Sequence, residues 1–128
     1  MTPDELRDRS RQFSMRIVQL YRALPKSVEA QVMGKQVLRA GTSVAANYRA
    51  ACRSRSRAEF VSKLAVVVEE ADESVYWLGM IAEAGLFPAK KMQSLQQEAL
   101  ELTKIFSASR STAQDGKKIT NYKSLNHK

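Results

Sequence analysis

The sequence has very little of the chemistry on which metal centres and many enzymes depend. Its 128 residues include one cysteine, Cys52, and one histidine, His127. A single cysteine excludes a disulfide within the chain, and this usage is typical of a reducing compartment. No Cys/His pair, glycine-rich phosphate loop or G-x-S-x-G motif is present in the sequence. We therefore expect a non-enzymatic protein that needs no cofactor and no metal.

Long apolar runs are also missing. No stretch approaches the roughly 20 apolar residues of a membrane span. The opening residues, M-T-P-D-E-L-R-D-R, lack the apolar centre of a secretion signal. We expect a cytoplasmic protein with no membrane partner.

Glycine and proline are scarce, with five and three residues respectively, so the secondary-structure elements should be few and long. Apolar residues recur every three or four positions in four segments, which predicts amphipathic helices. Short connections between them predict an all-α, antiparallel, up-down-up-down four-helix bundle. We expect residues 1–110 to form this domain and residues 111–128 to be a basic, disordered tail. The predicted helices span residues 3–24, 27–53, 57–84 and 88–107.

Local signals mark where these helices begin and end. Thr2 can cap the first helix and Ser27 the second. Ser56 and Glu59 have the spacing of a capping box directly before an apolar run. Gly85 suits the left-handed position that ends a helix.

The second helix contains Gly34 and Gly41, seven residues apart. Each glycine costs about 1 kcal/mol relative to alanine in a helix interior, so a close contact with another helix would have to compensate. We favour a continuous helix; the alternative is a break near Gly41, Thr42 and Ser43.

Positive charge is concentrated in the first half of the chain. The net charge is +8, and residues 1–64 carry thirteen Lys or Arg against five acidic residues. The segment from Arg49 to Arg57 contains four arginines and no acid. Guanidinium groups suit phosphate oxygens, so we expect salt-sensitive binding to RNA or DNA; the alternative is a solubilising corner. The candidate nucleic-acid-binding residues are Arg49, Arg53, Arg55, Arg57, Lys35, Arg39 and Lys63.

No aromatic platform accompanies these arginines. The nearest aromatic residue, Tyr48, has the spacing of a core position. We therefore expect recognition of the nucleic-acid backbone and not of the bases.

The third helix carries an acidic cluster of Glu69, Glu70, Asp72 and Glu73. A di-iron site in a four-helix bundle would require Glu-x-x-His pairs, and the one histidine lies in the predicted tail. The spacing of these acids is also that of an ordinary solvated helix face, which we prefer.

Glu70 and Glu73 have a second use as charge partners for arginines, either within the chain or across a subunit interface. Tyr76 and Trp77 adjoin the core stripe of the same helix. Aromatic residues are favoured in the centres of interfaces, but these two are equally suited to the core. Both alternatives stay open at the level of sequence.

Three motifs resemble a known bacterial family: R-A-G-T-S-V-A-A-N-Y at 39–48, R-S-R-A-E-F at 55–60, and E-A-D-E-S-V-Y-W-L at 70–78. The chain looks like the four-helix-bundle proteins encoded in intervening sequences of 23S rRNA genes. The resemblance covers roughly residues 10–106. Accessory proteins of diversity-generating retroelements are distant relatives.

The resemblance implies a four-helix bundle that assembles into a homo-oligomeric ring, commonly a pentamer. The retroelement relatives bind nucleic acid and a reverse transcriptase through a basic surface, which implies one or both as partners. Gly41 and Asn47 lie in the first motif, and we expect Asn47 to make hydrogen bonds that fix the register of a packed helix seam. The leading hypothesis is a nucleic-acid-binding homo-oligomer; the alternative is a protein-interaction scaffold whose charged corner serves self-assembly or docking.

Overall fold

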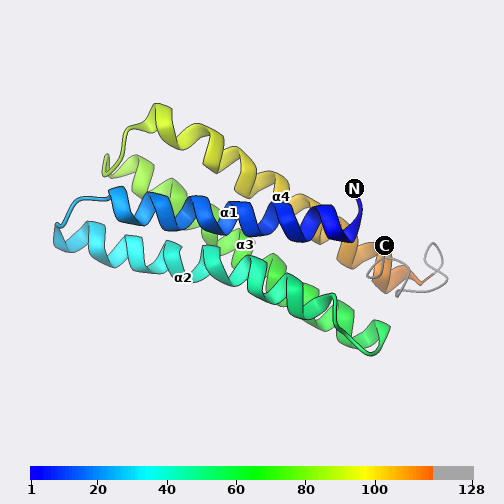
Figure 1. The fold of residues 1–128 in the computed structure, drawn as a ribbon. Helices are drawn as coiled ribbons and strands as arrows, with labels where there is room; N and C mark the ends of the chain where they lie inside the picture. Colours follow the sequence, from blue (N-terminus) through cyan, green and yellow to red (C-terminus); the bar gives the residue numbers. More distant parts are fainter. Residues whose placement is uncertain (117–128) are drawn as a thin grey trace.

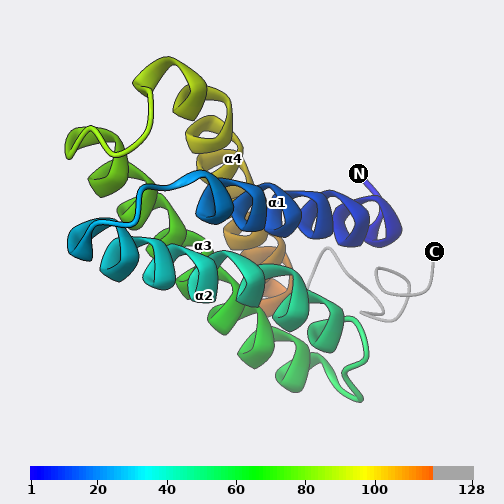
Figure 2. The ribbon, with the colours of Figure 1, turned by 60° about the vertical axis from the view of Figure 1, so that its left-hand side comes forward.

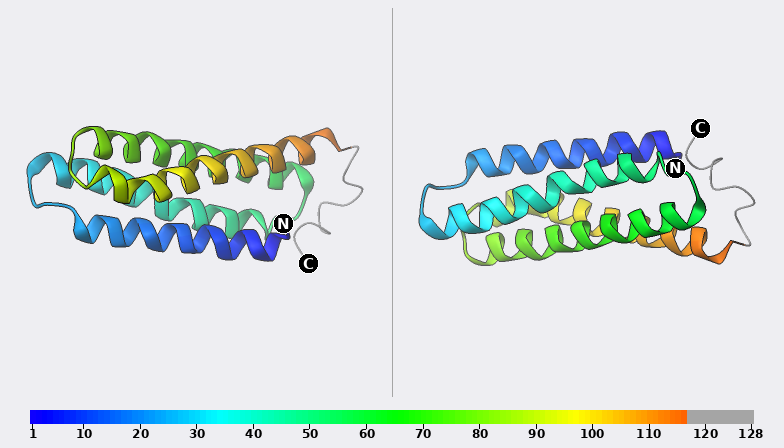
Figure 3. Two further views of the ribbon diagram at one scale, coloured as in Figure 1. Left: turned by 90° about the horizontal axis from the view of Figure 1, so that it is seen from above. Right: turned by 90° about the horizontal axis from the view of Figure 1, so that it is seen from below.

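The computed structural model describes residues 1–116, which form four α-helices joined by short turns (Figure 1). Each helix runs opposite to the one before it, as Figure 3 shows from above and below. The predicted all-α, up-down-up-down bundle is therefore confirmed. The helices are α1 (Pro3–Ala23), α2 (Val28–Ala51), α3 (Arg57–Glu83) and α4 (Ala89–Asp115).

This topology brings three distant parts of the chain to one end of the bundle. The start of α1, the turn between α2 and α3, and the end of α4 lie together at the right of Figure 1. Figure 2 shows the same end from a second direction. We call it the α2–α3 end, and it holds the candidate site.

The predicted helix caps are present. The Thr2 hydroxyl accepts a hydrogen bond from the Glu5 N–H at 3.1 Å, and the Glu5 carboxylate accepts from the Thr2 N–H at 2.8 Å. Ser56 caps α3 by accepting from the Glu59 N–H at 3.1 Å. The second half of this capping box differs from the prediction, because the Glu59 carboxylate accepts from the Arg55 N–H. Ser27 caps α2 through the Ala30 N–H.

The helix ends agree with the sequence patterns except at α4. Gly85 follows α3 with a φ of +67°, the left-handed conformation that was predicted. The predicted end of the fourth helix at residue 107 is wrong, and so is the assignment of residues 111–115 to a tail, because α4 continues to Asp115. Burial of Ala113 against the core supports these extra turns. The rest of the predicted tail, residues 117–128, lies outside the described residues.

The two glycines of α2 permit close packing against α1. A Cβ at Gly41 would lie 2.7 Å from Ile17 Cγ1, and one at Gly34 would lie 2.8 Å from Leu24 Cδ1. The buried Ser14 hydroxyl donates to the Gly41 carbonyl at 2.7 Å and so links the two helices. α2 runs unbroken through Gly41, which excludes a break at this position.

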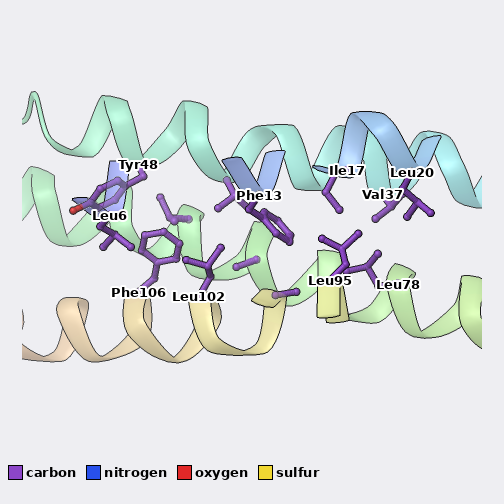
Figure 4. Packing of buried hydrophobic residues seen from close by; sticks show 14 of the residues in the cluster. Leu6, Phe13, Ile17, Leu20, Val37, Tyr48, Leu78, Leu95, Leu102 and Phe106 are labelled. Atoms are coloured by element: carbon purple, nitrogen blue, oxygen red, sulfur yellow. The ribbon is translucent and has the colours of Figure 1, made fainter. Parts of the chain in front are cut away.

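One hydrophobic core extends along the bundle axis (Figure 4). Tyr48 is 3% exposed and its ring centroid lies 5.1 Å from that of Phe106, so its predicted core position is confirmed. On the third helix, Ser74 and Ile81 are fully buried, whereas Val75 and Ala82 are only partly buried. Ser74 is accommodated because its hydroxyl donates to the Glu70 carbonyl of the same helix.

Candidate nucleic-acid interface

A basic pocket opens between α1 and the end of α2 and has a volume of about 610 Å³. Two of its arginines, Arg7 and Arg11, belong to α1. The other two are Arg49, in the last turn of α2, and Arg53, which follows the C-cap residue of that helix. Within each pair the residues are four positions apart, one helical turn, so both side chains lie on one face. The pocket is lined by Arg7, Arg11, Ala45, Ala46, Arg49, Cys52 and Arg53. We call it the arginine pocket, after its four arginines.

The charges of the arginine pocket are mostly uncompensated. Arg7 forms an ion pair with Asp4 in the first turn of α1, and no other ion pair is present among the four arginines within residues 1–116. No acidic residue lines the pocket. Like charges that line one pocket repel one another, so a bound anion would stabilise the arrangement.

Other arginines of the bundle are paired differently. Arg9 donates to Glu98 at 2.6 and 2.8 Å and to Glu101 at 3.1 Å, and these bonds join α1 to α4. Arg39 pairs with Glu70 at 3.6 Å and also with Glu73, which joins α2 to α3. Each of these two guanidinium groups has two carboxylate partners, whereas among the four arginines of the pocket only Arg7 has one.

Cys52 lines the pocket, and the buried Tyr48 lies next to it. Burial raises the pKa of the Tyr48 hydroxyl far above its usual range, and the neighbouring Cys52 thiol adds to this increase. Arg7 partly opposes it. The Tyr48 hydroxyl is therefore neutral at physiological pH and adds no negative charge beside the arginines.

The structure divides the arginines of the 49–57 segment among three environments. Arg49 and Arg53 line the pocket. Arg55 is exposed on the turn between α2 and α3. Arg57 points toward the end of α4, because a Cβ at Gly116 would lie 2.5 Å from its Nη1 atom. A cation in this position interacts favourably with the negative end of the α4 dipole.

The remaining basic candidates lie apart from the pocket. Lys35 is fourteen residues before Arg49, which is roughly 21 Å along α2. Arg39 is engaged with the two glutamates of α3. Lys63 forms an ion pair with Glu59 at 3.5 Å on its own helix. The structure thus brings only Arg49 and Arg53 of the seven candidates into the pocket.

Asn47, Tyr76 and Trp77 are the residues for which the sequence suggested roles in a helix seam or an interface. The Asn47 amide donates to the Ser43 carbonyl within α2, so this hydrogen bond does not cross the helix seam. Tyr76 is 57% exposed, and Trp77 is partly buried against the core. Their rings meet edge to face, with centroids 4.9 Å apart.

Sequence reasoning missed Arg7 and Arg11. They lie in the first helix, far from the arginine-rich segment, and only the antiparallel packing of α1 on α2 places them beside Arg49. Their four-residue spacing was a usable signal once that packing had been predicted. The hydrogen bond from Ser14 to the Gly41 carbonyl, which joins α1 to α2, was also missed, and no pattern in the sequence indicated it.

Among residues 1–116, no group of three or more His, Cys, Asp or Glu side chains is arranged to hold a metal ion. Within the same range, no helix combines the length and apolar character that a membrane crossing requires.

The fold and the arginine pocket define an all-α four-helix-bundle protein with a cationic groove at one end. The family model for the 23S rRNA-intervening sequence proteins matches residues 5–108. The chain belongs to this family, which confirms the resemblance seen in its three motifs.

A crystal structure of a protein of unknown function from the S23 ribosomal protein family of Bacteroides thetaiotaomicron is similar to this chain. The two are 34% identical, and the match covers 87% of this chain and 99% of the other with a TM-score of 0.80. No curated protein matches the chain.

Proposed function

We propose that this protein is a non-enzymatic, homo-oligomeric module that binds the phosphate backbone of RNA or DNA at the α2–α3 end. The observation that carries the proposal is the arginine pocket, in which Arg7 alone of the four arginines has a carboxylate partner within residues 1–116. Exposed Arg55 extends this surface onto the adjacent turn. The family's link to 23S rRNA genes is consistent with an RNA ligand.

Backbone recognition is favoured over base recognition. No aromatic residue lines the pocket, and the buried Tyr48 is packed against Phe106. Stacking of bases would require exposed aromatic rings. Contacts from arginine to phosphate give affinity without sequence preference and depend strongly on salt.

A binding experiment with one matched control tests the proposal. Affinity for a structured RNA and for duplex DNA is measured by fluorescence anisotropy between about 50 and 200 mM salt. The variant R11S/R49S/R53S should bind more weakly and show a shallower salt slope, by about 0.9 per lost duplex-DNA phosphate contact. The control R22S/K26S/K90S removes the same charge at the opposite end of the bundle.

Two results would contradict the proposal. One is the absence of binding by the wild-type protein at the lowest salt concentration. The other is equal weakening in the pocket and control variants, which would show that net charge and not the α2–α3 end attracts nucleic acid.

A second candidate function is a scaffold that binds another protein. Exposed apolar side chains on α2 and α3 favour it, since Val28 is 80%, Val32 55% and Tyr76 57% exposed. Co-purification from the native host separates the candidates. A stoichiometric protein partner without nucleic acid supports the scaffold.

A further inference from the structure

The arginine pocket is concave, and its volume is that of a small-molecule site. Pockets for small ligands typically have volumes of roughly 300–1,000 Å³, and this one measures about 610 Å³. A duplex is a convex rod, so it would contact the rim of such a pocket and leave the interior unfilled. The interior therefore suits a ligand smaller than a nucleic-acid helix.

The charge of the pocket indicates the charge of that ligand. The pocket brings together Arg7, Arg11, Arg49 and Arg53, and within residues 1–116 only Arg7 has an ion-pair partner, Asp4. An internal phosphodiester contributes one negative charge per nucleotide. A terminal phosphate alone carries about −1.5 to −2, and a chain of phosphates concentrates still more charge in a small volume. A polyphosphate therefore matches the four guanidinium groups better than a backbone segment does.

The lining of the pocket is not purely cationic. Ala45, Ala46 and Cys52 contribute apolar surface to it beside the four arginines. Apolar lining combined with a few charged groups is typical of sites for organic ligands. Guanidinium planes also stack on nucleobases, so an arginine that is not bound to phosphate can cover a base.

We propose that the arginine pocket binds a nucleoside polyphosphate, with the phosphate chain held by arginines of the pocket and the nucleoside placed against its apolar lining. Free nucleoside triphosphates and the 5′-triphosphate end of an RNA strand carry this same group. The assignment goes beyond backbone binding and does not depend on it.

Isothermal titration calorimetry with ATP, GTP and inorganic tripolyphosphate, without divalent cations, tests the assignment. Saturable binding of a nucleotide is expected, and it should weaken by at least about tenfold when two charge-assisted contacts are lost in R49S/R53S. The control R22S/K26S should bind as the wild type does. Circular dichroism of each variant verifies that it is folded.

Three outcomes would overturn the proposal. Absence of nucleotide binding would exclude a nucleoside polyphosphate as the ligand. Equal weakening of binding in both double variants would exclude the arginine pocket as the binding site. Tripolyphosphate that binds as tightly as ATP and GTP removes the nucleoside from the assignment.

An oligonucleotide pair separates the two sources of the ligand. An RNA with a 5′-triphosphate is compared with the same RNA carrying a 5′-hydroxyl. Tighter binding of the triphosphate form supports capture of RNA ends, whereas equal binding together with ATP affinity supports a free nucleotide. Backbone binding with no affinity for any triphosphate overturns this inference and leaves the proposed function intact. Nucleotide binding with no affinity for RNA or DNA overturns the proposed function and leaves this inference intact.

Discussion

The neighbours of each arginine decide its role in this protein. Arg9 and Arg39 each contact two glutamates of another helix and thereby stabilise the bundle. Arg49 and Arg53 belong to the arginine-rich segment, but their neighbours are Arg7 and Arg11 of α1. Local density of arginine in the sequence therefore indicated the end of the bundle at which the arginine pocket lies, but it did not distinguish the ion-paired arginines from those that line the pocket.

Glycine at position 41 permits the close approach of α1 and α2. In G41A the new methyl group would lie 2.7 and 2.8 Å from the two γ-carbons of Ile17, which is too short for an undisturbed core. Overpacking of this kind costs about 1–3 kcal/mol. We expect a lower urea midpoint with an unchanged m-value.

Gly79 provides the control for this substitution. It also lies inside a helix, but no atom is within 4 Å of the position that a Cβ would occupy. G79A should therefore stabilise the protein by up to about 1 kcal/mol through helix propensity. Equal stability changes in the two variants would contradict the close-contact role of Gly41.

At the scale of elements, ion pairs join helices that already share the core. Arg39 connects α2 to Glu70 and Glu73 on α3. Burial raises the pKa of Glu70, Arg39 partly opposes this increase, and the nearby charges of Glu73 and Glu69 add to it. The link between these helices thus includes a carboxylate whose charged form is disfavoured by its surroundings.

This imbalance gives a pH prediction. A carboxyl whose pKa is higher in the folded than in the unfolded state binds protons more readily when folded, so stability falls as pH rises through that interval. The neutral variant E70Q escapes this loss. Its free energy of unfolding relative to the wild type should increase as pH rises from below 4.5, the reference pKa of Glu70, and then level off. A difference in free energy of unfolding between E70Q and the wild type that does not change with pH would contradict this role of Glu70.

The whole molecule presents its basic pocket at one end and exposed apolar residues on its flanks. We propose that copies of the chain assemble into a ring, as the family resemblance implies. Such a ring would repeat the arginine pocket once per subunit, and simultaneous contacts would raise the affinity for a long nucleic acid.

Sedimentation equilibrium tests the ring directly. The expected mass is a small multiple of the 14.4 kDa chain. If exposed Tyr76 belongs to the interface, Y76K should lower the mass, because burial of an unpaired ammonium group is costly. L100K places the same charge on α4, where Leu100 is 42% exposed, and should leave the mass unchanged. A monomeric wild-type protein would contradict the ring, and an unaffected Y76K variant would exclude Tyr76 from the interface.

Sequence alone determined the four helices, their antiparallel order and the N-terminal caps of the first three. These features depend on local periodicity and on hydrogen bonds between residues a few positions apart, such as Thr2 with Glu5. The final turns of α4 were not predictable in this way, because burial of Ala113 depends on other helices.

Only the tertiary structure decided which charges meet. The pairing of Arg9 with Glu98 joins residues 89 positions apart, and the arginine pocket joins Arg7 to Arg49 across two helices. Helical periodicity specifies the face on which a side chain lies, but the neighbour it meets depends on how the helices pack. The candidate site is therefore a product of the packing of α1 on α2, which Gly34 and Gly41 make close.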